Sequence, residues 1–97
     1  MYGNLQKTHS DSVRELRTAG GLWLRNLREA SGLSQREFAD QVGVTYYTFI
    51  SQVENGRGRL PPDRYEVWAD ALGMDRKVFV RELMRYYDPV THKILFD

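Results

Sequence analysis

The sequence predicts an all-α domain built from five helices. Apolar residues recur at intervals of three and four residues over most of the chain, which is the spacing of one helix face. Glycines and prolines divide this pattern into segments of helical length, and one segment opens with a complete capping box, Ser34-Gln35-Arg36-Glu37. No stretch predicts a convincing sheet, and the chain has no internal repeat.

The composition is that of an ordinary globular protein and narrows the choice of function. The 97 residues fit one domain, with 41% hydrophobic and 28% charged residues. The absence of cysteine excludes disulfides, cysteine-ligated metals and thiol catalysis. A net charge of +1 indicates no partner by itself, although Arg57 and Arg59 have few acids nearby and weakly indicate a basic patch.

The chain shows no membrane signal. No apolar run is long enough to span a bilayer, and the N-terminus lacks the apolar core of a signal peptide. We therefore expect a cytoplasmic protein with no membrane partner.

Three regions are expected along the chain. Residues 1–19 form a tail or a short leading helix, residues 20–87 the domain, and residues 88–97 a C-terminal arm. The first ten residues are polar and aperiodic, which is typical of a tail. The alternative is an arm that enters a DNA minor groove with Lys7 and His9.

The first helix is expected to start near Ser10 or Asp11, either of which can cap it, and to end at Gly32. Two adjacent glycines, Gly20 and Gly21, stand in its middle. Because glycine is unfavourable inside a helix, the pair predicts a break or a short leading helix.

Two short helices follow. The capping box starts the second helix, which ends at Gly43, and we expect Thr45 to cap a third helix that closes at Gly56. Ile50 and Val53 give the third helix its inward face. Two short helices joined by a tight turn containing glycine form a helix-turn-helix arrangement.

Prolines and aspartates delimit the remaining helices. Pro61-Pro62-Asp63 starts a fourth helix that stops at Gly73, and Asp75 caps a fifth helix that stops at Asp88-Pro89. The final stretch, VTHKILF, is apolar and is expected to be a short strand or an arm that packs on its own core or on a partner. The following residues are expected in the core: Trp23, Trp68, Phe79 and Leu83.

The stretches "LREASGLSQREFADQVGV" and "ISQVENG" resemble the helix-turn-helix domain of the Cro and phage-repressor family, the lambda-repressor-like fold of the xenobiotic-response-element class of regulators. The resemblance covers about Leu22 to Leu83. It implies a five-helix domain that binds double-stranded DNA, usually as a homodimer on an inverted-repeat operator. The third helix would lie in the major groove with its N-terminal side chains on base edges.

The resemblance assigns the start of the third helix to base reading. The candidates are Thr45, Tyr46, Tyr47, Thr48, Ser51 and Gln52. From Gly43 to Gly56 this chain is one residue longer than the family pattern. Counting forward from Thr45 places Tyr46 and Tyr47 at the first base-reading positions, whereas counting back from Ile50 places Tyr47 and Thr48 there. Both counts include Tyr47. The alternative is that Tyr46 or Tyr47 packs inward as part of the core.

Other polar residues are expected to contact phosphates. Gln35 and Asn55 match phosphate-binding positions of the family, and Arg36 lies beside the first of them. Arg57 and Arg59 flank Gly58 in a loop and are candidate phosphate clamps. The alternative for Gln35 and Arg36 is an ordinary solvated surface position.

The resemblance also implies a structural pair and leaves a dimer surface open. Arg28 and Glu54 match a partly buried ion pair between the first and third helices. The candidates for a dimer surface are Tyr86, Tyr87, Ile94, Leu95 and Phe96. The alternative is that these residues cover the first helix of their own domain.

The most favoured function is therefore a sequence-specific transcriptional regulator, in the form of a dimeric repressor or autoregulator. An antitoxin-like module that binds an unidentified protein, with secondary DNA binding, is the alternative indicated by the apolar C-terminus. We expect no enzyme, cofactor or metal, because His9 and His92 lie in the two expected tails and no catalytic or metal-binding spacing occurs.

Overall fold

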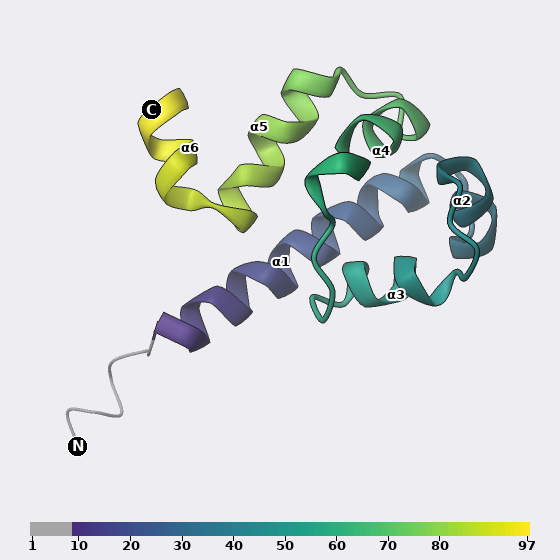
Figure 1. Ribbon diagram of the computed structural model, residues 1–97, viewed down its shortest axis with the longest axis horizontal. Coiled ribbons are helices and arrows are strands. Elements are labelled where there is room, and N and C mark those ends of the chain that lie inside the picture. The colour runs from purple at the N-terminus through teal and green to yellow at the C-terminus, as the bar shows by residue number, and fades with distance from the viewer. Residues whose placement is uncertain (1–8) are drawn as a thin grey trace.

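The computed structural model describes residues 9–97, which form an all-α fold (Figure 1). Six α-helices and one 3-10 turn follow one another in this part of the chain: α1 (His9–Ala30), α2 (Gln35–Val42), α3 (Thr48–Glu54), η2 (Pro62–Arg64), α4 (Tyr65–Ala71), α5 (Arg76–Tyr87) and α6 (Pro89–Phe96). The predicted all-α class is confirmed, and these residues contain no strand. The predicted number of five helices is wrong. Most of the expected N-terminal tail, including Lys7 of the candidate minor-groove arm, lies outside the described residues.

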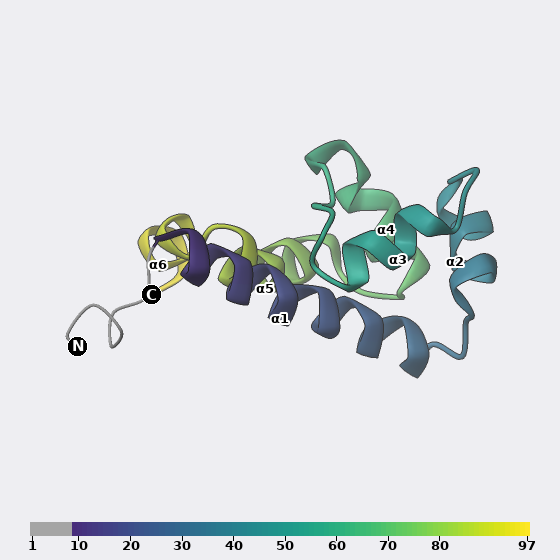
Figure 2. The ribbon, with the colours of Figure 1, turned by 90° about the horizontal axis from the view of Figure 1, so that it is seen from below.

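Helix α1 is continuous, so the break predicted at Gly20 and Gly21 is wrong. A Cβ atom on Gly21 would lie 2.3 Å from the carbonyl oxygen of Glu54 in α3. On Gly20 it would lie 2.7 Å from Cβ of Tyr86 in α5. The two glycines therefore let α3 and α5 approach the backbone of α1 closely. Helix α1 is the long helix against which α3 and α5 pack (Figures 1 and 2).

The second helix begins and ends as predicted. The backbone N–H of Glu37 donates to Oγ of Ser34 over 3.1 Å, and the N–H of Ser34 donates to Oε1 of Glu37 over 2.9 Å. These bonds lower the pKa of the Glu37 carboxyl. Gly43 adopts φ +73° and its N–H caps the helix end, a conformation that favours glycine.

Helix α3 begins at Thr48, three residues beyond the cap predicted at Thr45. Tyr47 occupies the N-cap position without a side-chain capping bond. The turn between α2 and α3 runs over residues 43–47. The turn is longer, and the helix behind it starts later, than the sequence indicated.

The core lies between α1 and the helices packed along it. Its buried apolar members are Leu24, Phe38, Ala39, Val42, Ile50, Val53, Leu60, Trp68, Ala69, Phe79, Leu83 and Tyr87. Trp68 meets the ring of Phe38 edge-on, with the centroids 4.9 Å apart. Trp23 is half-buried at the border of the core, where it stacks on Phe79 and Tyr86. The core predictions for Trp68, Phe79 and Leu83 are confirmed.

The C-terminal segment forms a sixth helix instead of the expected strand or arm. The carboxylate of Asp88 accepts hydrogen bonds from the N–H and the hydroxyl of Thr91, over 3.1 and 2.6 Å, and Pro89 occupies the first helical turn. The Asp-Pro pair that ends α5 thus also starts α6. His92, expected in a tail, is buried in this helix, which packs against α5.

Candidate nucleic-acid interface

Helix α3 buries one face and exposes a small polar one. Ile50, Val53 and Glu54 are buried, and Thr48, Gln52 and Asn55 are exposed. At about 100° per residue the three exposed side chains share one arc of the helix, bordered by Phe49 on one side and Ser51 on the other. This arc carries no apolar side chain, and its hydrogen-bonding groups face outward.

The two tyrosines of the turn also face outward. The exposed fraction of Tyr46 is 74% and that of Tyr47 is 39%, so neither belongs to the core. Phe49 is the aromatic residue that turns inward, with its ring 6.5 Å from that of Trp68. The lengthened turn therefore adds two exposed phenol groups beside the polar arc of α3.

Arg36 contacts one of these tyrosines. Its guanidinium carbon lies 4.6 Å from the centroid of the Tyr47 ring. Arg36 belongs to the first turn of α2, and Tyr47 directly precedes α3. A cation over an aromatic face is attracted by the ring quadrupole, so this contact links the two helices of the motif at its exposed surface.

An ion pair fixes the far end of α3 to α1. Nε of Arg28 donates to Oε2 of Glu54 over 2.6 Å, and Nη2 donates to Oε1 over 3.0 Å. Nη1 of Arg28 donates to the carbonyl of Leu33 over 2.7 Å. The hydrogen bond to Glu54 raises the pKa of Arg28. Both side chains are buried, so removing one partner would leave an uncompensated charge at a cost of about 3–5 kcal/mol.

Gln35 is drawn into the same network. Its Nε2 donates to Oε1 of Glu54 over 3.1 Å, which leaves its backbone N–H in the first turn of α2 for an anion. A small hollow beside it joins α1, α2 and α3 and is lined by Leu22, Arg25, Gln35, Ser51, Glu54 and Asn55. The structure thus brings Gln35 and Asn55 together. It adds Arg25, which the sequence analysis did not single out and whose contact with Glu29 is long, at 3.5 Å.

The loop arginines have different surroundings. Arg57 is exposed, and its backbone N–H donates to Oδ1 of Asn55 over 3.0 Å. Arg59 is turned toward the end of α5, where Nη1 donates to the carbonyl of Tyr87 over 3.2 Å and the guanidinium lies 4.5 Å from the Tyr87 ring centroid. The head of Arg59 is therefore already engaged by its own domain.

The candidates for a dimer surface differ in exposure. Tyr87 is buried, its hydroxyl accepts the N–H of Leu60 over 3.0 Å, and burial raises its pKa. Tyr86 packs against Trp23 and Gly20 and is half-buried. These two residues cover their own domain, which was the alternative. The remaining candidates, Ile94, Leu95 and Phe96, are exposed on α6 together with Val90.

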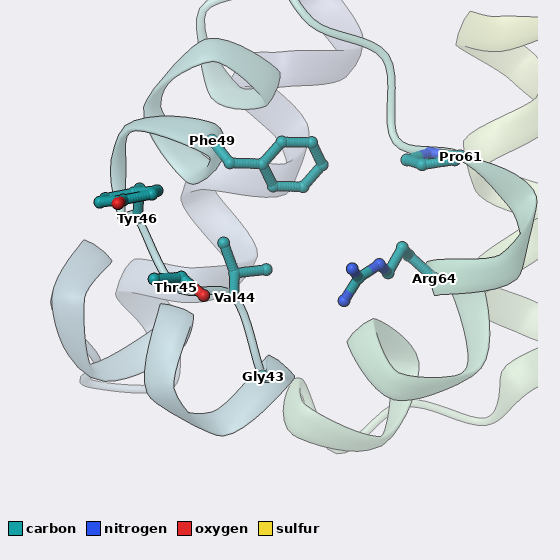
Figure 3. A pocket seen from close by; sticks show the side chains of 7 residues that line it. All are labelled: Gly43, Val44, Thr45, Tyr46, Phe49, Pro61 and Arg64. Carbon is teal, nitrogen blue, oxygen red and sulfur yellow. The ribbon is translucent and has the colours of Figure 1, made fainter.

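A second hollow borders the turn on the other side of α3 (Figure 3). It is lined by Gly43, Val44, Thr45, Tyr46, Phe49, Pro61 and Arg64. Figure 3 shows the guanidinium of Arg64 reaching across from the α3–α4 connection toward Val44, with the ring of Phe49 above it. The sequence analysis missed Arg64, because its place beside the turn depends on the long connection between α3 and α4.

Residues 9–97 contain neither a candidate metal cluster nor a membrane-spanning helix. Among these residues no group of three or more His, Cys, Asp or Glu side chains is placed to hold a metal ion. None of the helices in this range has the length and apolar character needed to cross a membrane.

Comparison with known families supports the motif seen in the fold. A family model described as a helix-turn-helix domain matches residues 19–83, which is more than half of the chain. The match begins in the middle of α1 and ends inside α5, so it includes the whole of α2, the turn and α3. No curated protein matches the sequence.

Proposed function

The chain belongs to the helix-turn-helix family of DNA-binding domains, and we propose that it is a sequence-specific, double-stranded DNA-binding regulator of transcription of the Cro and phage-repressor type. In this proposal α3 lies in the major groove and reads base edges. The observation that carries it is the exposed polar arc of α3, held in place by the buried Arg28–Glu54 pair and preceded by two exposed tyrosines.

The base-reading candidates gain different support from their positions. Thr48 and Gln52 lie on the exposed arc, and Thr45, Tyr46 and Tyr47 lie in the turn before it. Ser51 is half-buried at the border, beside the hollow that contains Gln35 and Asn55. We therefore assign base reading to the turn and the exposed arc, and phosphate contact to the side of α3 that Ser51 faces.

Phosphate contacts are proposed for Gln35, Asn55 and Arg57, with Arg25 as an addition. Gln35 would use its backbone N–H, because its amide already donates to Glu54. Arg36 is proposed to act through Tyr47 as well as by its charge. Arg59 is withdrawn from this set, because its guanidinium is bound to Tyr87.

We propose that the active form is a homodimer, which is the arrangement expected for a repressor or autoregulator on an inverted repeat. The exposed apolar residues of α6 support this, since such side chains are seldom left together in water on so short a helix. The same surface favours the second candidate, an antitoxin-like module whose α6 binds a different protein while DNA binding is secondary.

The test is selection of random duplex DNA on the purified protein, followed by a salt titration of the selected sequence against a scrambled one. We expect an inverted repeat with half-sites about one helical turn, or roughly 34–36 Å, apart. Affinity for both sequences should fall with salt, and the preference for the selected one should persist.

The other outcomes are informative. Enrichment of a single half-site would retain DNA recognition and remove the dimer. Weak binding without selection, at every salt concentration, would overturn the regulator and leave the protein-binding module.

A further inference from the structure

The exposed arc of α3 is bordered by one arginine on each side. Ser51 and Asn55 face the hollow that contains Arg25, and Phe49 faces the hollow that contains Arg64. Phe49 and Ser51 are about 200° apart around the helix, so the two hollows lie on opposite sides of α3.

Arg64 is half-buried, and its guanidinium has no partner for its charge among residues 9–97. It makes no hydrogen bond or ion pair with these residues. The walls around it are mainly apolar, from Val44, Phe49 and Pro61, and the hollow measures about 280 Å³. Figure 3 shows the guanidinium extended toward the turn instead of folded back on its own helix.

We propose that Arg64 binds a backbone phosphate of DNA on the wall of the major groove opposite to that contacted by Gln35 and Asn55. This inference rests on the proposed function. An α-helix is about 10–12 Å across and the major groove about 12 Å wide, so a helix seated in the groove has a phosphate backbone on each side. A cation on the Phe49 side of α3 would therefore face the second backbone, and Arg64 is the cation of that hollow.

The chemistry of the hollow suits a phosphodiester. A guanidinium presents planar, parallel N–H groups that match two phosphate oxygens. Thr45 lies on the same rim, and its hydroxyl supplies a further donor. The apolar walls lower the effective dielectric constant around the arginine, which strengthens its attraction for an anion.

The experiment compares Arg64→Gln and Arg64→Lys with the unaltered protein on the selected operator and on scrambled DNA. Arg64→Gln should weaken binding to both sequences by a similar factor and reduce the slope of log K against log salt by about 0.9. Arg64→Lys keeps the charge and should retain the slope. Arg85→Gln is the matched control: it removes an exposed arginine of α5, and should leave the slope unchanged.

Operators with a single methylphosphonate locate the contact. Replacing one phosphate on the strand facing Phe49 should weaken the unaltered protein and leave Arg64→Gln unaffected. An unchanged salt slope in Arg64→Gln, with operator selection intact, would overturn the Arg64 clamp and keep the proposed function. If the unaltered protein binds no DNA, both the Arg64 clamp and the proposed function are wrong. Thermal unfolding of each variant separates the clamp from a merely structural role, because the clamp predicts altered binding at unaltered midpoint temperature.

Discussion

The guanidinium of Arg36 lies over the ring of Tyr47, 4.6 Å from its centroid, and joins the start of α2 to the start of α3. A cation in the first turn of a helix faces the positive end of the helix dipole, which is unfavourable. The aromatic face partly offsets this. The contact also restricts the tyrosine ring, so the phenol hydroxyl is presented in a fixed direction beside the exposed arc of α3.

The first prediction concerns this pair as a reading unit. Tyr47→Ala should relax base preference at one or two operator positions by about 1–3 kcal/mol each, because a direct contact to a base edge is lost. Arg36→Ala should relax the same positions by a smaller amount, and a double-mutant cycle should give a coupling of about 0.5–1 kcal/mol. Binding to a library of single-base operator variants measures all three quantities.

Tyr46→Ala is the matched control for this experiment. Tyr46 is the more exposed of the two tyrosines, and in the part of the chain that the structure describes it makes no cation–π contact with Arg36. If the operator positions affected by Arg36→Ala and Tyr47→Ala differ, the two residues act independently and Arg36 is a simple phosphate contact.

The second prediction concerns the crossing of α1 and α3. Gly21→Ala should reduce the free energy of unfolding by about 3 kcal/mol or more, since its Cβ would lie 2.3 Å from a backbone oxygen that cannot move away. Ala19 lies two residues before Gly21 and is exposed, so Ala19→Gly should reduce the free energy of unfolding by only about 1 kcal/mol. Urea unfolding monitored by circular dichroism compares them. An increase in the stability of Gly21→Ala would mean that helix propensity, which favours alanine over glycine, and not the close crossing, governs this region.

These glycines show what sequence reasoning could and could not reach. The capping box at Ser34 and the stop at Gly43 depend on neighbouring residues alone, and both were predicted correctly. The effect of Gly20 and Gly21 depends on Tyr86 and Glu54, which are far away in the sequence. Local propensity predicted a break, whereas tertiary packing uses the missing side chains to bring helices together.

The candidate site divides along the same line. The motif and the Arg28–Glu54 pair followed from the order and spacing of residues in a familiar pattern. The direction taken by Arg59 did not, because it is decided by the carbonyl and ring of Tyr87 at the end of α5. Arg64 was missed for the same reason: the chain between α3 and α4 brings it to the turn, and no local signal records that placement.

The third prediction separates the two loop arginines. Arg57→Ala should weaken binding to all DNA sequences and lower the salt slope by about 1, because an exposed cation beside α3 is lost. Arg59→Ala should leave the slope nearly unchanged and reduce the free energy of unfolding by about 1 kcal/mol, since its contact with Tyr87 is lost. Salt titrations and urea unfolding on the same two proteins decide it. A reduced salt slope for Arg59→Ala would restore it as a phosphate clamp.

The fourth prediction concerns the pH dependence of α6. The hydroxyl and then the backbone N–H of Thr91 donate to the Asp88 carboxylate and hold its pKa below the ordinary value. The folded pKa is lower than the unfolded one, so Asp88 stabilises α6 at neutral pH, and that stabilisation is lost as the pH falls below about 4. The amide resonance of Thr91 should therefore shift with the titration of Asp88. Asp88→Asn retains an N-cap acceptor without titrating, and in that variant the shift should disappear.

The fifth prediction tests the apolar surface of α6. Val90, Ile94 and Leu95 are exposed by 68%, 75% and 65%, whereas His92 of the same helix is buried and the helix packs against α5. Deleting the whole segment would also remove the buried His92, so a point change is the sharper test. Ile94→Asp should convert a dimer into a monomer in sedimentation equilibrium, and its unfolding midpoint should no longer depend on protein concentration. Lys93→Asp places the same side chain on the neighbouring exposed position and should leave the dimer intact.

The DNA-binding consequence follows from symmetry. A dimer contacts two half-sites through one rigid pair of α3 helices, whereas a monomer must bind each half-site separately. Ile94→Asp should therefore lose most of its affinity for the inverted repeat and retain its affinity for an isolated half-site. If the unaltered protein is already a monomer with and without operator, the second-copy role of α6 is wrong, and its exposed apolar face belongs to an interface with another protein.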